Sequence, residues 1–109
     1  MAKIIAFETA QTVIRWRKER QFYALMSRYW SFYLRGDSYM ASADDVATAH
    51  GFAFNCYRMP ASAPDEVHAL MAKANRYDQQ ANRYYRQAQE LAAELWPSGV
   101  KKAGPRGAA

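Results

Sequence analysis

Four arginines are the side chains of this sequence best suited to binding a ligand: Arg17, Arg20, Arg28 and Arg35. If residues 17–35 form a helix, a rotation of about 100° per residue places all four within an arc of about 120°. Guanidinium groups in such a stripe bind phosphates along a nucleic-acid backbone or form bidentate pairs with the carboxylates of an acidic protein. The pattern predicts a partner-binding stripe, leaves the class of partner open, and also fits a solvated polar face.

Aromatic side chains lie close to arginines in two parts of the sequence. Trp16 precedes Arg17, and residues 74–80 repeat as residues 81–87, so that an Arg-Tyr pair recurs after seven positions. The residues of this repeat that we expect to bind a partner are Arg76, Tyr77, Arg83, Tyr84 and Tyr85. Trp and Tyr rings stack on exposed bases or anchor a protein interface, and they can equally complete a hydrophobic core.

Residues able to catalyse a reaction or to bind a metal ion are few. Cys56 is the only cysteine, and six positions separate it from His50. On a helix this separation turns the two side chains about 240° apart, too far for a nucleophile and its base. We therefore expect a small buried thiol and a partly exposed imidazole. His68, and the pair Asp44 and Asp45, which are next to each other in the sequence, lack the spacing of metal ligands. The sequence therefore predicts no enzyme activity, no cofactor and no metal ion.

Positive charge is concentrated at the two ends of the chain, whose net charge is +5. Residues 1–38 hold seven Lys and Arg against three acidic residues, and residues 97–109 hold three against none. This distribution suits binding to a polyanion and also plain solubility. Residues 98–109 are predicted to form a basic flexible tail, in which Lys101, Lys102 and Arg106 would add to nucleic-acid binding.

The strongest structural pattern runs from Ser62 to Pro97. Ser62 and Asp65 are spaced as a capping box, and Pro64 suits the first turn of a helix. Nine residues then follow in alternating steps of three and four: Val67, Leu70, Ala74, Tyr77, Ala81, Tyr84, Ala88, Leu91 and Leu95. This heptad pattern predicts one helix, either in a bundle core or in a self-pairing coiled coil. Its roughly 32 residues extend about 48 Å, more than the diameter of a compact chain of this size, so we expect either an elongated hairpin or bundle or a helix of which part projects and meets a second chain.

A second helix is predicted from Phe22 to Arg35, with a wide apolar surface beside the arginine stripe, and Gly36 is expected to end it. Upstream, Arg15 and Glu19 fall on the apolar side, so we expect a kink or an exposed section between Arg15 and Arg20. The composition also fits a helix lying at a membrane surface, whereas no run of about 20 apolar residues is present to span a bilayer.

The segment between the long helices has a weaker pattern. Residues 42–45, Ser-Ala-Asp-Asp, resemble a helix start and predict a third helix from about Ala43 to Arg58, although Phe52 to Tyr57 also alternate as a short strand would. The predicted fold is all-α: an elongated three-helix bundle with two long antiparallel helices and one shorter helix, forming a single domain of residues 1–97.

The aromatic content, 15% of all residues, exceeds what we expect three helices to bury. We therefore predict a small non-catalytic interaction protein, such as an adaptor, inhibitor or assembly subunit, that binds another protein or a second copy of itself. The alternative is binding of DNA or RNA through Arg17, Arg28, Arg35 and the basic tail. The N-terminus lacks the apolar stretch of a signal peptide, which predicts a cytoplasmic location.

Overall fold

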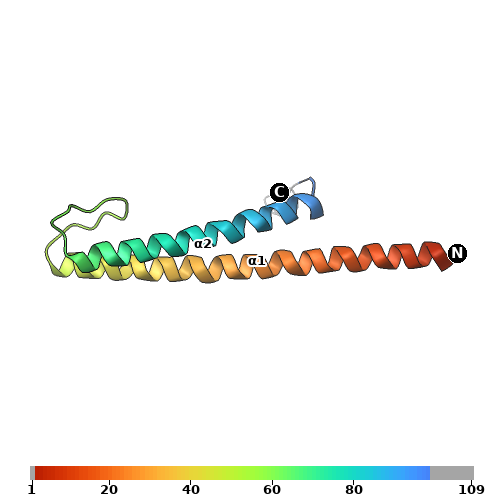
Figure 1. Ribbon diagram of the computed structural model, residues 1–109, viewed down its shortest axis with the longest axis horizontal. Coiled ribbons are helices and arrows are strands. Elements are labelled where there is room, and N and C mark those ends of the chain that lie inside the picture. The colour runs from red at the N-terminus through yellow and green to blue at the C-terminus, as the bar shows by residue number, and fades with distance from the viewer. Residues whose placement is uncertain (1, 99–109) are drawn as a thin grey trace, which may run out of the picture. The chain divides into compact units, whose positions relative to one another are not determined.

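The computed structural model describes residues 2–98, with side chains from Thr9 onward, and this range contains two α-helices (Figure 1). α1 spans Ala2–Ala49 and α2 spans Asp65–Leu95. No strand occurs among residues 2–98, so the all-α prediction is confirmed, whereas the shorter third helix is not found there. From residue 99 onward, the predicted tail lies outside the described residues.

The chain divides into two compact units. The hairpin unit, Arg28–Arg83, contains the second half of α1, the connecting loop and the first part of α2. The terminal unit combines Met1–Ser27 with Tyr84–Ala109 and so contains the first half of α1 and the end of α2.

Gly36 lies inside α1, so the prediction that it ends a helix is wrong. The residue is buried where α1 meets α2. A Cβ at this position would lie 3.0 Å from Asp78 Oδ1 and 3.1 Å from the carbonyl oxygen of Ala74. Glycine inside a helix costs about 1 kcal/mol relative to alanine. Here its lack of a side chain lets the two helix backbones approach each other closely.

The glycine that ends α1 is Gly51, whose φ of 83° lies in the left-handed region. Its N–H donates to the carbonyl of Thr48 at 3.0 Å, and the N–H of Phe52 donates to the carbonyl of Ala47 at 2.9 Å. These two bonds form a Schellman motif. The helix start predicted at residues 42–45 is therefore wrong, because these residues lie within the last turns of α1.

α1 also runs without interruption through residues 15–20. Of the two possibilities expected there, the kink is absent and the exposed section is present, since all residues from Thr9 to Arg17 are exposed. Arg15 Nε and Glu19 Oε2 form an ion pair at 3.2 Å across one helical turn. A pair with this i,i+4 spacing supports the helix locally.

α2 confirms the helix predicted from the heptad pattern. Asp65 and Glu66 occupy its first turn, where their charge is favourable for the helix dipole. The carbonyl of Pro64 accepts a hydrogen bond from the N–H of Val67 at 2.9 Å. Every second heptad residue is buried: Val67, Ala74, Ala81, Ala88 and Leu95. The four residues between them are half-buried, so the predicted seam is the inner face of α2.

In the hairpin unit the two helices run antiparallel, with small side chains along their contact. Gly36 of α1 approaches Ala74 of α2, while Ala43, two turns further along α1, packs in one cluster with Val67, two turns earlier in α2. A large ring fills the space beside this close approach, because Tyr77 stacks on Tyr39 with ring centroids 5.4 Å apart.

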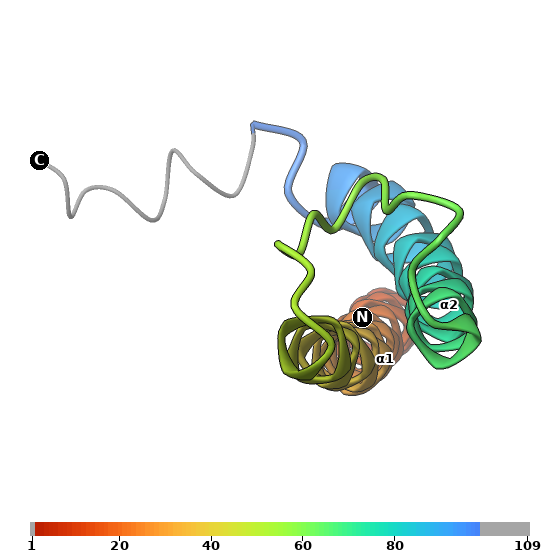
Figure 2. The ribbon, with the colours of Figure 1, turned by 90° about the vertical axis from the view of Figure 1, so that its left-hand side faces the viewer.

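The connecting loop takes the place of the predicted third helix. Residues 52–57 are neither helix nor strand, and the loop lies across one side of both helices (Figure 2). Its Met59 and Ala63 are buried in the cluster that also contains Ala47 and Met71, and Phe52 and Phe54 pack against that cluster. The loop therefore supplies an apolar third layer at this end of the hairpin.

In the terminal unit the helices are also antiparallel. Phe22 of α1 contacts Trp96 edge to face, with ring centroids 5.2 Å apart. One helical turn earlier in α1, Lys18 Nζ lies 2.7 Å from Glu94 Oε1. Leu25, further along α1, and Ala88, earlier in α2, are also buried in this unit.

Replacement of Gly36 by Leu tests the close approach of the helices. Leucine favours a helix more than glycine does, but its side chain would collide with the backbone of Ala74. We expect Gly36→Leu to lower the free energy of unfolding by about 1–3 kcal/mol in circular-dichroism melts. The control is Ser38→Leu, at an exposed position of the same helix. Equal stability of the two variants would contradict the packing described here.

Candidate interaction surfaces

An exposed aromatic cluster lies on α1 in the hairpin unit. It consists of Tyr29, Trp30 and Tyr33, and the side chains of Trp30 and Tyr33 are 50% and 41% exposed. Trp30 contacts both tyrosines edge to face, with ring centroids 5.1 Å from Tyr29 and 5.6 Å from Tyr33, and the two tyrosines stack at 5.8 Å. These mutual contacts hold large apolar rings in place at the surface, which lowers the entropy lost when a partner covers them.

This cluster lies on the same side of α1 as the residues that the loop covers. Met40 and Ala47 follow Tyr33 at intervals of seven residues, so all three lie along one stripe of the helix. Ala47 is buried under the loop and Met40 packs against the same cluster, whereas Tyr33 and Trp30 are exposed. We call this side of α1 the aromatic flank. The apolar residues of the loop lie at the Ala47 end of this flank and leave Tyr33 and Trp30 open.

The terminal unit has exposed aromatic residues of its own. Trp16 is 53% exposed and Tyr23, seven residues later, is 62% exposed. The guanidinium of Arg20 lies over the ring of Trp16, 4.8 Å from its centroid, and Tyr23 contacts Phe22 edge to face at 5.2 Å. Trp16, predicted from the sequence to bind a partner, is therefore accessible there.

The predicted arginine stripe is not a simple row of solvated charges. All four arginines are exposed. However, Arg20 stacks on Trp16 as described, and Arg35 lies over the ring of Phe32 with its Cζ 5.5 Å from the centroid. A guanidinium on a ring face keeps its in-plane N–H donors for another ligand. The role of Arg17, Arg20, Arg28 and Arg35 in binding remains a prediction.

The predicted binding residues of α2 differ in their surroundings. Tyr77 is half-buried and stacks on both Tyr39 and Phe32, the latter at 6.0 Å, so it holds the helices of the hairpin unit together. Tyr84 is half-buried, whereas Tyr85 is 39% exposed. Arg76 and Arg83 are exposed. Lys101, Lys102 and Arg106 lie outside the described residues.

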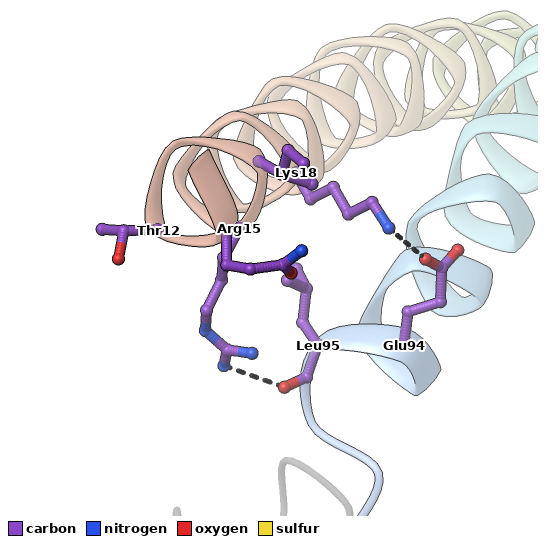
Figure 3. Close-up of a pocket in the computed structure, with 7 residues that line it drawn as sticks. Thr12, Arg15, Lys18, Glu94 and Leu95 are labelled. Atoms are coloured by element: carbon purple, nitrogen blue, oxygen red, sulfur yellow. Dashed lines mark hydrogen bonds and ion pairs between the residues drawn. The ribbon is translucent and has the colours of Figure 1, made fainter. Parts of the chain in front are cut away.

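An open depression in the terminal unit is lined by polar and apolar side chains from both helices (Figure 3). An Arg15 Nη2–H donates to the carbonyl oxygen of Leu95 at 2.9 Å, and Lys18 pairs with Glu94. The charged groups of the depression thus bind each other or the end of α2. This arrangement caps the last turn of α2, whose final carbonyls have no partner within the helix.

Cys56 lies in the connecting loop, and His50 and His68 lie near the ends of the two helices that the loop joins. Cys56 is exposed in the loop, so the expectation of a buried thiol is wrong, because the predicted helix that would bury it does not form. His50 Nδ1 lies 3.0 Å from the carbonyl of Val46, and His68 Nε2 lies 3.1 Å from that of Pro60. Among the described residues, no group of three or more His, Cys, Asp or Glu is arranged to bind a metal ion.

Comparisons of this chain with protein-family models, with curated proteins and with solved structures each gave no match. Within residues 2–98, neither helix has an apolar stretch long enough to cross a bilayer.

Tyr77 and Tyr23 provide a matched test of which rings support the fold. We expect Tyr77→Ala to lower the free energy of unfolding by about 2 kcal/mol or more, because two stacked rings lose their partner. Tyr23→Ala, on an exposed helical position, should change it by about 0.5 kcal/mol or less. Chemical denaturation of both variants measures the difference. A similar loss in both would show that Tyr77 has no special structural role.

Proposed function

We propose that this chain is a small, non-catalytic interaction protein that binds another protein, or a second copy of itself, through the exposed aromatic side chains of α1. The observation that carries the proposal is the partial covering of the aromatic flank. Its Ala47 end is buried under Phe52, Phe54 and Met59 of the chain's own loop, and its Trp30 end is open. A surface that accepts an apolar layer at one end is suited to accept another alongside it.

The composition of the buried core supports this proposal. Between Thr9 and Ser98, the largest side chain that is completely buried is that of Val67, and most of the other buried residues are alanines. Larger rings such as Trp16, Tyr23 and Trp30 are left half or more exposed. Trp and Tyr contribute most to the binding energy at protein interfaces, where burying one such ring is worth about 2 kcal/mol or more.

A photo-crosslinking amino acid at position 30 tests the proposal. If the aromatic flank binds a protein in its host cell, irradiation should join the chain to a discrete protein, identified by mass spectrometry as another protein or a second copy. The control carries the same amino acid at Ser38, an exposed position of α1 away from the cluster. We expect adducts from position 30 to exceed those from position 38 by about tenfold.

Two results together would contradict the proposal. The first is equal or absent crosslinking at positions 30 and 38. The second is a strict monomer in light scattering over the concentration range of the experiment.

A further inference from the structure

Cations from both helices gather on the side of the hairpin unit opposite the aromatic flank. Arg35 precedes by one residue Gly36, which faces α2, and Arg28 lies seven residues before Arg35 on the same stripe of α1. Tyr33 and Met40 instead each follow by one residue a position that contacts Tyr77 of α2, namely Phe32 and Tyr39. We call the positions of either helix that face the other helix seam positions. The residue before a seam position and the residue after it point to opposite sides of the contact between the helices. The arginines therefore lie on the side away from Tyr33, Met40 and the loop.

α2 contributes to this same side. Lys73 precedes the buried Ala74 by one residue, and its Nζ lies over the ring of Tyr39 in α1, 4.9 Å from the centroid. Because the helices are antiparallel, the residues that precede seam positions on both helices share one side of the pair. Arg76 and Arg83 lie next to Lys73 and Gln80 at i,i+3 spacing. We call this surface the basic flank: Arg28, Arg35, Lys73, Arg76 and Arg83, all exposed.

The residues between these cations are small or polar. Ser31 and Ser38 of α1 and Gln80 of α2 fill the intervening positions, and all three are exposed. The acidic residues nearest in sequence, Asp37 and Asp78, each follow a seam position and so belong to the other side of the hairpin. Positive charge is thus segregated onto one surface of the unit, with hydroxyl and amide donors beside it.

We propose that the basic flank binds the phosphate backbone of a duplex nucleic acid without reading its sequence. This inference goes beyond the proposed protein binding and rests on a different surface. Arg28 and Arg35 are seven residues apart, as are Arg76 and Arg83, so each helix presents cations at intervals of about 10.5 Å. Arg, Lys, Ser and Gln are residues that contact phosphates in such complexes, and phosphate contacts position a protein on a duplex without specifying sequence.

Two features favour a duplex over other anionic partners. A protein interface needs an apolar centre. The exposed residues between the cations of the basic flank are polar or small, and the two rings among them, Phe32 and Tyr39, are half-buried under Arg35 and Lys73. Single-stranded nucleic acid is bound by aromatic rings that stack on its bases. The exposed rings Trp30 and Tyr33 lie on the aromatic flank and the exposed Tyr57 lies in the connecting loop, so none of the three belongs to the basic flank. What remains is an electrostatic surface, which is the main source of sequence-independent duplex binding.

Fluorescence anisotropy with the full chain and labelled 20-base-pair DNA and RNA duplexes of two unrelated sequences tests this inference. With four or five phosphates contacted, the logarithm of the association constant should fall with the logarithm of salt concentration with a slope of about −4. Affinity should be similar for the two sequences. A single strand of the same length and vesicles containing anionic lipid serve as comparison probes and should bind less tightly.

The variant Arg76→Gln with Arg83→Gln should bind the duplex roughly tenfold or more weakly at about 0.1 M salt, with a slope smaller in magnitude by about 2. Its control is Arg15→Gln with Arg58→Gln, which removes the same charge from exposed positions outside the basic flank. The control should retain binding to within about twofold. A melting curve for each variant verifies that both remain folded.

A third variant separates the basic flank from the tail. With Lys101, Lys102 and Arg106 changed to Gln, duplex binding should still depend on Arg76 and Arg83. The inference is overturned if the tail variant loses duplex binding while the variant at Arg76 and Arg83 retains it. It is also overturned if that variant and its control lose duplex binding equally, or if no duplex binds at about 50 mM salt. Tighter binding of single strands or of anionic vesicles would also overturn it.

Discussion

The close approach of α1 and α2 in the hairpin unit determines where every large side chain of that unit can lie. Gly36 faces the backbone of Ala74, and the neighbouring seam positions are mostly alanine. A seam of this kind lets backbones approach but gives little volume in which to bury rings. Aromatic residues therefore lie beside the seam, as Tyr39 and Tyr77 do, or on the outer surface, as Trp30 does.

The connecting loop partly compensates for this thin core. Two packed helices bury one stripe of each, and a chain of this length needs further apolar contacts to offset the loss of conformational entropy. Phe52, Phe54 and Met59 supply them over Ala47. Asn55 shapes the turn that returns the chain, because its Oδ1 accepts hydrogen bonds from the N–H groups of Tyr57 and Arg58 at 2.8 and 3.3 Å. The rest of the aromatic flank, at Trp30 and Tyr33, stays exposed in this chain.

The sequence predicted α2 well because three independent signals agreed there: acidic residues and Pro64 at its start, an unbroken heptad seam, and Pro97 after its end. α1 was predicted poorly because Gly36 has the residue type of a helix terminator while its function is steric, and only the facing Ala74 reveals this. Gly51 carried a better signal, since the apolar Phe52 that follows it is typical of a Schellman motif.

Several aromatic residues of the candidate surfaces could have been found by continuing the seam of α1 through Gly36. That seam places Tyr33 on one side of the contact with α2, next to the exposed Trp30, and Arg35 on the other side. The packing of the loop in one cluster with Ala47 could not be predicted, because it depends on tertiary contacts of residues 52–63, whose local pattern favours neither helix nor strand. The helix wrongly predicted from about Ala43 to Arg58 also led to the expectation that Cys56 is buried.

The most direct test of the account is the accessibility of Trp30 in a chain where it is the only tryptophan, with Trp16 and Trp96 changed to Phe. In the dilute, isolated chain the account predicts long-wavelength emission that iodide quenches readily. The emission should shift to shorter wavelength and lose most of its quenching when a protein partner or a second copy covers the aromatic flank. Short-wavelength, unquenched emission in the isolated monomer would contradict the account, because the flank would then already be covered.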